Sequence, residues 1–238
     1  MGVLRVGLMP RIAVRTARWV GMGLGLVAGG YAACVAAGWW RFGRPNPPAA
    51  DEADGWLDRF IPQYDVAERF RVRIGAPAEV TLTAATEMSL EDSAVIRGII
   101  RARALVLGAT PDTTTRPRGL LAQSLSLGWG LLAEDPGREI VMGAVTQPWR
   151  GNVVFRAIPP DLFADFHEPD FVKIVWTLRA DSLSPTASIF RTETRAMTTD
   201  AGARRKFRWY WARFSPGIVL IRILTLRMLK AEAERRAS

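Results

Sequence analysis

Cysteine and histidine are almost missing from this sequence, and their scarcity excludes several kinds of chemistry. Cys34 is the only cysteine and His167 the only histidine among 238 residues. One cysteine cannot form a disulfide within the chain. Zinc needs about four Cys or His ligands in a structural site and about three protein ligands in a catalytic site, so we expect no metal and no cofactor. A lone histidine in a loop-like segment is typical of a surface residue.

Acidic residues are missing from the first 50 positions, and charge is unevenly distributed along the chain. Residues 1–44 carry six Arg and no acid, residues 200–238 carry ten basic and three acidic residues, and the net charge is +9. The middle, residues 45–199, therefore has a slight excess of acids. Nucleic-acid binding needs a basic folded face with a reading motif. We therefore predict no nucleic-acid partner.

The longest uncharged segment covers residues 19–40 and follows a basic tail, residues 1–18. As a helix it would be about 33 Å long, enough for a bilayer core of about 30 Å. Aromatic residues and arginines bracket the segment as they do at membrane interfaces. These interface residues are Arg18, Trp19, Trp39, Trp40 and Arg41. The segment predicts a single transmembrane helix.

The arginines around this segment also predict its orientation. More of them precede the segment than follow it, and acids begin soon after it at Asp51. The positive-inside rule then predicts a cytoplasmic N-terminus and an extracytoplasmic domain. Two alternatives remain open. Residues 35–37 could serve as a signal-peptide cleavage site, and residues 31–34 weakly resemble a lipoprotein processing site.

Small residues form one face of the same predicted helix, because they recur at every fourth position. They are Gly21, Gly25, Gly29 and Ala33, with Ala37 continuing the series. Two successive G-x-x-x-G steps let two backbones approach closely, which predicts a homodimer through the membrane helix. The alternative is that membrane helices are simply rich in glycine.

The remaining sequence predicts one α+β domain. Residues 41–56 are rich in proline and then in acids, which indicates an extended linker, and the domain covers residues 57–238. Residues 66–74 alternate between apolar and basic side chains, as in a strand with one solvated face. Two helical segments follow, one starting at Pro77 and one over residues 92–107. About five or six antiparallel strands and a helix over residues 200–236, kinked at residues 215–217, complete the pattern.

This order of elements and several short motifs resemble a known superfamily. The motifs are VRIGAPAEV at 72–80, GWG at 128–130, TQPW at 146–149, FRTETR at 190–195 and SPG at 215–217. They are similar to those of an uncharacterised bacterial family of the START-like, or SRPBCC, helix-grip superfamily. The resemblance implies an antiparallel curved sheet wrapped around the C-terminal helix and enclosing an apolar cavity. Relatives bind lipids, sterols, polyketides or hormones, and some are cyclases.

Candidate site residues follow if the less charged strand faces turn inward. The predicted cavity wall consists of Phe70, Trp129, Phe155, Trp176, Phe190, Thr192, Trp209, Trp211 and Phe214. A mostly apolar wall suits a hydrophobic ligand, whereas the alternative is that these residues fill a solid core. Glu68 is the only acid in the apolar set of its strand. It is a candidate general base, although its place near the strand start favours the solvated rim.

Two groups of charged residues have simpler predicted roles. Arg191, Glu193 and Arg195 predict a pattern of opposite charges on the outer face of the sheet. The basic cluster at residues 204–208 either meets anionic lipid headgroups or forms a solvated helix face. No nucleophile and base can be paired from the sequence, so no catalytic residue is assigned.

The sequence favours a binding module for a lipid or other hydrophobic small molecule, anchored in the bacterial inner membrane. The alternatives are a cyclase- or hydrolase-like enzyme that uses the same pocket, and a structural protein of the envelope without a ligand. Fold alone does not decide between them.

The predicted orientation can be tested with a reporter. A periplasmically active phosphatase fused after Ser238 should be active in a bacterial host, because the domain should lie outside the cytoplasm. Activity only from a cytoplasmic reporter at the same position would reverse the orientation.

Overall fold

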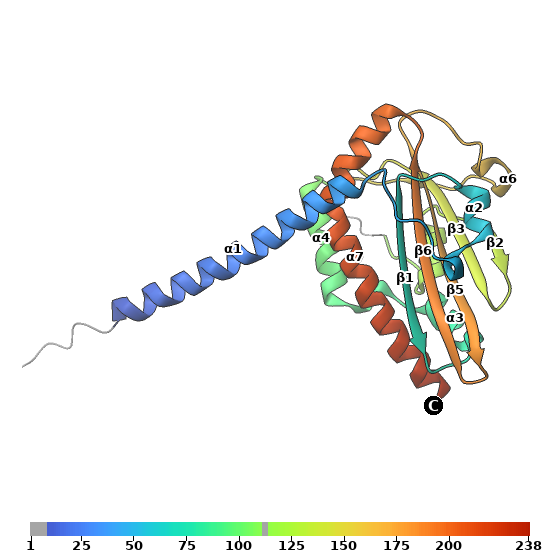
Figure 1. The fold of residues 1–238 in the computed structure, drawn as a ribbon, viewed down its shortest axis with the longest axis horizontal. Helices are drawn as coiled ribbons and strands as arrows, with labels where there is room; N and C mark the ends of the chain where they lie inside the picture. Colours follow the sequence, from blue (N-terminus) through green and yellow to red (C-terminus); the bar gives the residue numbers. More distant parts are fainter. Residues whose placement is uncertain (1–8, 111–113) are drawn as a thin grey trace, which may run out of the picture.

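The computed structural model describes residues 9–110 and 114–238, and it has the predicted α+β class (Figure 1). Helices and strands follow in the order α1 (Met9–Arg41), η1 (Ala50–Glu52), α2 (Gly55–Phe60), β1 (Val66–Ile74), α3 (Ala78–Glu87), η2 (Leu90–Asp92), α4 (Ala94–Val106), α5 (Leu120–Ser126), β2 (Gly130–Asp135), β3 (Glu139–Thr146), β4 (Phe155–Arg156), α6 (Pro160–Phe163), β5 (Val172–Ser184), β6 (Ala187–Thr198) and α7 (Ala201–Ala237).

Six strands form one antiparallel sheet, in the order β1-β6-β5-β3-β2 with β4 paired to β3. A tight turn joins β2 to β3, and Gly137 takes a positive φ of 76° there, a conformation that glycine adopts without steric cost. The long helix α7 lies across one face of the sheet (Figure 1). This arrangement is consistent with a helix-grip fold.

The face of the sheet toward α7, here called the inner face, carries two hydrophobic cores. The Trp176 core includes Ile74, Met142, Trp176, Phe190 and Leu229, and it is closed by α3 and the second half of α7. The Phe207 core consists of Phe42, Val66, Val172, Ala196, Phe207 and Trp211, and it is closed by the first half of α7. The side of α7 that faces the sheet is therefore apolar in both halves of the helix.

The opposite, outer face is covered as well, so the prediction of a solvated face is wrong for its middle. A third core, the Phe60 core, contains Leu57, Phe60, Ile61, Leu132, Val141, Phe163 and Val175. Its side chains come from α2 and α6 on one side and from β2, β3 and β5 on the other. The segment predicted as a linker also lies against this face, since Asn46 O accepts a hydrogen bond of 2.8 Å from Arg69 Nη1.

Helix α7 bends, and the end of α1 packs along its first half. Pro216 lies inside α7 and lacks the N–H of a regular helical bond, which explains the predicted kink. Tyr31 Oη donates to the carbonyl of Arg213 at 2.7 Å. Further along α1, the ring of Phe42 meets that of Phe207, with centroids 5.7 Å apart. The last turns of α1 therefore run antiparallel to the first turns of α7.

No helix within the residues searched, those whose placement is described, is long and apolar enough to cross a membrane. The predicted transmembrane helix over residues 19–40 thus finds no support there. Its C-terminal third is in contact with α7. The side chains of Arg18, Trp19 and Gly21 lie outside the described residues.

The predicted glycine stripe does not make the helix contact that is observed. A Cβ added to Gly25 or Gly29 would meet nothing within 4 Å, and Ala33 is exposed. Gly38 makes the close approach to α7 instead, because a Cβ there would lie 3.0 Å from Ser215 Oγ and 3.4 Å from the Cα of Ala212. The predicted homodimer through the stripe remains a prediction.

Substitution of Gly38 tests this junction. Gly38→Val should destabilise the chain by about 1–3 kcal/mol, because the added carbons overpack the contact with α7. Gly25→Val is the matched control, since its surroundings are open in this chain. Thermal melts of the full chain in detergent measure the difference, and equal melting temperatures for the two variants would contradict the packing described here.

Candidate functional site

A row of polar side chains crosses the inner face between its two cores. Glu68 of β1 pairs with Thr194 of β6, and Thr194 pairs in turn with Trp176 of β5. The next pair of residues on the same face, toward the Phe207 core, is Val66 of β1 with Ala196 of β6. Because side chains alternate along a strand, all of these point toward α7. The polar row is therefore enclosed by apolar layers above and below.

Arg222 brings a positive charge from α7 to this row. Its Nη2 donates to Thr194 Oγ1 at 2.7 Å and its Nη1 donates to Thr192 Oγ1 at 3.3 Å. Burial lowers the pKa of the Arg222 guanidinium to about 10, although Glu68 opposes the shift. The guanidinium of Arg222 has five N–H donors, and the two neutral threonine hydroxyls accept only two of them, so most find no partner in the row. Arg222 was not among the predicted site residues.

Glu68 lies deeper than the solvated rim at which the sequence placed it. Its side chain is partly buried on the inner face, and burial raises its pKa, while the charges of Arg41 and Arg222 pull the pKa back down. No hydrogen bond or ion pair joins its carboxylate to another described residue. Burial therefore favours the neutral form of this carboxyl group, and the two arginine charges favour its ionised form.

Four of the predicted cavity residues gather around a fifth, Trp176, next to the polar row. The ring of Trp129 stacks on Phe155 with centroids 4.9 Å apart and meets Trp176 edge-on at 5.9 Å. Phe190 and Trp176 are buried in the Trp176 core, and Phe70 packs against it while remaining partly accessible. These aromatic side chains form one wall of the inner face.

The other predicted residues are divided between the row and the first half of α7. Thr192 belongs to the polar row. Trp211 is buried in the Phe207 core, and Phe214 packs on Tyr210 with centroids 5.0 Å apart. Trp209 is 54% exposed and faces away from the sheet. The structure therefore brings Trp129, Phe155 and Trp176 together with the row, but it does not bring Trp209 to them.

Of the predicted membrane-interface residues at the end of α1, Trp39 packs on α7. The Trp39 ring lies 4.7 Å from that of Trp209, and Arg208 lies over Trp39 at 4.0 Å. Trp40 is 68% exposed, and Arg41 is exposed close enough to Glu68 to affect its pKa.

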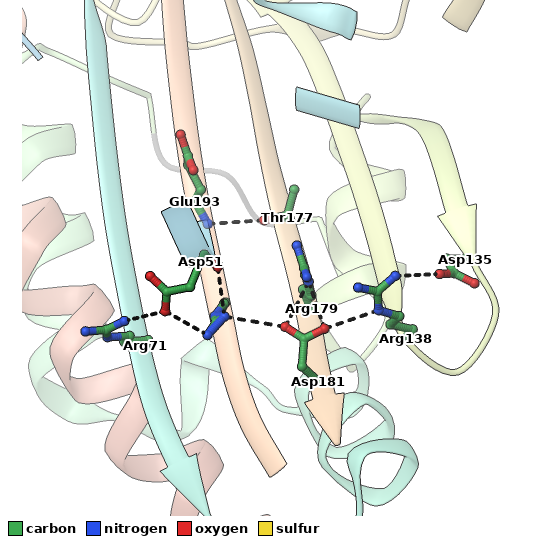
Figure 2. Close-up of polar contacts among 9 residues, drawn as sticks. Asp51, Arg71, Asp135, Arg138, Thr177, Arg179, Asp181 and Glu193 are labelled. Carbon is green, nitrogen blue, oxygen red and sulfur yellow. Dashed lines mark hydrogen bonds and ion pairs between the residues drawn. The ribbon is translucent and has the colours of Figure 1, made fainter. Parts of the chain in front are cut away.

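Ion pairs cross the outer face of the sheet in a continuous series (Figure 2). The alternating charges run in the order Arg71, Asp51, Arg191, Asp181, Arg138 and Asp135, and Arg179 also binds Asp181. Exposed pairs of this kind each contribute little to stability. Their effect is geometric, because Asp51 fixes η1 on the sheet.

Arg195 completes the outer-face charge pattern that the sequence predicted, but it is fully buried rather than solvated. Its Nε lies 2.7 Å from Glu193 Oε1, and its Nη1 lies 2.6 Å from Asp58 Oδ1. The guanidinium also lies 4.7 Å from the centre of the Tyr64 ring. A desolvated charge needs such partners, so Arg195 fixes α2 against β6.

Two carboxyl groups meet under α2. Asp54 caps α2 by accepting hydrogen bonds from the N–H groups of Trp56 and Leu57, and it lies against Glu139 at the start of β3. Burial, and after it the neighbouring Asp54, raise the pKa of Glu139 from 4.5 to about 8, against the opposing charges of Arg179 and Arg138. The protonated Glu139 can donate to Asp54 near neutral pH.

Neither these carboxyl groups nor others suggest a metal centre. The part of the chain that the structure describes contains no group of three or more His, Cys, Asp or Glu side chains that could hold a metal ion.

Two hollows of about 30 Å³ and about 490 Å³ are lined mainly by outer-face residues, and Asp54 and Arg179 line both.

The pH dependence of stability tests the carboxyl pair. Between pH 4.5 and about 8 the unfolded chain has released the Glu139 proton while the folded chain keeps it. The free energy of unfolding should therefore fall as pH rises through this window, by at most about 1.4 kcal/mol per pH unit. Glu139→Gln should remove this component, because its amide donates to Asp54 at every pH.

Urea unfolding at several pH values measures the effect, with Glu134→Gln as the matched control on exposed β2. A slope in Glu139→Gln that equals that of the wild type would show that Glu139 does not keep its proton in the fold.

Comparison with known proteins gives distant matches among solved structures only. No protein-family model matches the chain, and no curated protein matches its sequence. One match is a hypothetical protein from Helicobacter pylori, with 9% identity, 79% of this chain and 99% of that chain covered, and a TM-score of 0.38. Another is the Zhui aromatase/cyclase from Streptomyces sp. R1128, with 13% identity, 73% and 96% covered, and a TM-score of 0.27. A START superfamily protein from Mycobacterium smegmatis matches at 11% identity, 72% and 96% covered, and a TM-score of 0.25. These values assign neither a substrate nor an activity to this chain.

Proposed function

We propose that this chain is a membrane-anchored binding module for a lipid or other hydrophobic small molecule, held between the sheet and α7. The observation that carries the proposal is the polar row on the inner face. Glu68 is partly buried there without a hydrogen-bond partner among the described residues, and the partly buried Arg222 lies close enough to affect its pKa. Burying ionisable groups costs free energy unless they are paired. A ligand with a polar group would supply the missing partner.

The apolar surroundings of the row favour a ligand that is otherwise hydrophobic. Trp129 and Phe155 are partly accessible beside Trp176, and the Trp176 core continues below them. Binding sites for small molecules are mostly apolar with a few polar groups that fix orientation. An amphipathic molecule would place its head on Glu68, Arg222 and the two threonines, and its body along the aromatic wall.

Anchoring through α1 is the second part of the proposal. Leu26 is 77% exposed and Val27 is 73% exposed, so this part of α1 presents apolar side chains that the protein does not cover. A lipid bilayer would cover them. We place the anchor in the bacterial inner membrane, with the domain on the extracytoplasmic side, on the strength of the arginine distribution.

A catalytic use of the same pocket is a second candidate, and the raised pKa of Glu68 is the observation that favours it. Carboxyl groups with raised pKa values act as general acids or bases near neutral pH. Such an enzyme would convert the bound molecule, whereas a binding module would release it unchanged. The mass of the molecule recovered after incubation separates the two.

Trp176→Ala tests the binding site. The full chain in mild detergent should bind a fluorescent fatty acid, and native mass spectrometry should detect a co-purified apolar molecule. We expect Trp176→Ala to weaken binding at least about tenfold with a smaller loss of stability than the roughly 3–5 kcal/mol of a solid aromatic core. Trp211→Ala is the matched control, because Trp211 is buried in the other inner-face core.

Glu68→Gln completes the experiment by changing charge without changing size. It should alter the affinity for a charged fatty acid more than that for its neutral methyl ester. A wild-type chain that binds neither probe, together with equal unfolding of the two tryptophan variants, would refute the binding function and leave a structural role.

A further inference from the structure

The contact between α1 and α7 determines where the exposed apolar surface of α1 ends. Met22, Leu26, Val27 and Tyr31 are all more than half exposed. Contacts with α7 begin at Tyr31, whose hydroxyl donates to the carbonyl of Arg213. Beyond this point α1 faces protein on the side toward α7. Lipid can therefore surround α1 only up to about Tyr31, rather than up to Trp40.

The first half of α7 presents an exposed stripe beside this point. Arg205, Trp209 and Arg213 are spaced four residues apart and are exposed. Four-residue spacing places them on one face of the helix. Arg213 lies over the Trp209 ring at 4.9 Å. Together with Tyr31, these three residues form what is called here the junction surface.

The ion pairs of the domain decide which basic residues are available at this surface. Arg204 is paired with Asp65 and Lys206 with Asp170, so both charges are balanced within the fold. Arg205 makes no ion pair with any described residue. Of the cluster at residues 204–208, Arg205 is thus the exposed basic residue that no acid of the described residues neutralises.

No acid interrupts the positive charge of α1 or of α7 as far as residue 231. Residues 1–50 contain no Asp or Glu, and residues 201–231 contain none either. Exposed tryptophan and tyrosine rings next to arginine are typical of the headgroup layer of a membrane. A nucleic acid would need a reading motif as well, and the apolar residues of α1 that adjoin the surface suit lipid chains.

We propose that the junction surface binds the headgroups of anionic lipids and that the membrane boundary on the domain side lies near Tyr31. This inference rests on the proposed anchoring through α1. Arg213 lies at the level of Tyr31, and Arg205 lies about 12 Å further along α7. That distance is comparable with the headgroup layer plus one Debye length of roughly 8 Å. Both arginines are thus within electrostatic reach of an anionic surface.

Hydrogen–deuterium exchange of the full chain in lipid nanodiscs tests the proposal. The discs contain either phosphatidylcholine alone or phosphatidylcholine with about a third of phosphatidylglycerol. Amides of residues 201–214 should exchange about tenfold more slowly in the anionic discs, because each arginine near such a surface strengthens the contact roughly fivefold. The double variant Arg205→Gln with Arg213→Gln should lose most of this protection.

The matched control is Arg73→Gln with Arg227→Gln, which removes the same charge from exposed positions far from the junction and should keep the protection. A wild-type chain that enters both kinds of disc and exchanges equally in them would overturn the junction surface alone. Equal protection in the wild type and in the Arg205 and Arg213 double variant would also overturn it. A chain that enters neither kind of disc would overturn the anchoring and this inference together.

Discussion

The packing of α7 across the inner face of the sheet is the contact on which the other features depend. Its two halves close separate cores, with Phe207 and Trp211 in one and Leu226 and Leu229 in the other. Between these cores Arg222 reaches the threonines of β6. A polar row can persist inside the domain because apolar contacts on both sides hold the helix over it. The same helix also provides the surface on which the end of α1 packs.

Charged side chains form close ion pairs on the outer face of the sheet, whereas Glu68 and Arg222 of the inner face do not. On the outer face, residues 50–61 bring Asp51 and Asp58 to the arginines of the strands, so that even the fully buried Arg195 is paired. A desolvated charge without such partners would strongly destabilise the fold. On the inner face, Glu68 and Arg222 interact electrostatically but do not form a close pair. Unpaired polar atoms therefore occur on both faces, since Arg69 Nε, Arg191 Nε and Arg195 Nη2 of the outer face are buried without a hydrogen-bond partner among the described residues.

Local patterns predicted the elements but not the contacts between distant segments. The alternation of β1 gave its bounds at Val66–Ile74, and the N-cap Asp200 and the long apolar stripe gave α7 almost to its last residue. The segment over residues 41–56, which lies against the outer face, was predicted as a linker because its prolines and acids have no periodicity. Its partners lie far away in sequence, since Asp51 and Arg191 are 140 residues apart. The role of Arg222 was missed for the same reason, because its threonine partners lie on another element.

The pairing of β1 with β6 also has a consequence for how the chain reaches its fold. Val66 pairs with Ala196 of β6. During synthesis, roughly 130 further residues must therefore be added before β1 can pair with β6, its neighbour in the described sheet. An unpaired strand is a template for association with other chains. Arg69, Arg71 and Arg73 project from alternate positions of β1. Their mutual repulsion between copies would keep the unpaired strand from joining a neighbouring nascent chain, and in the folded chain Glu193 pairs with Arg69 and Asp51 pairs with Arg71.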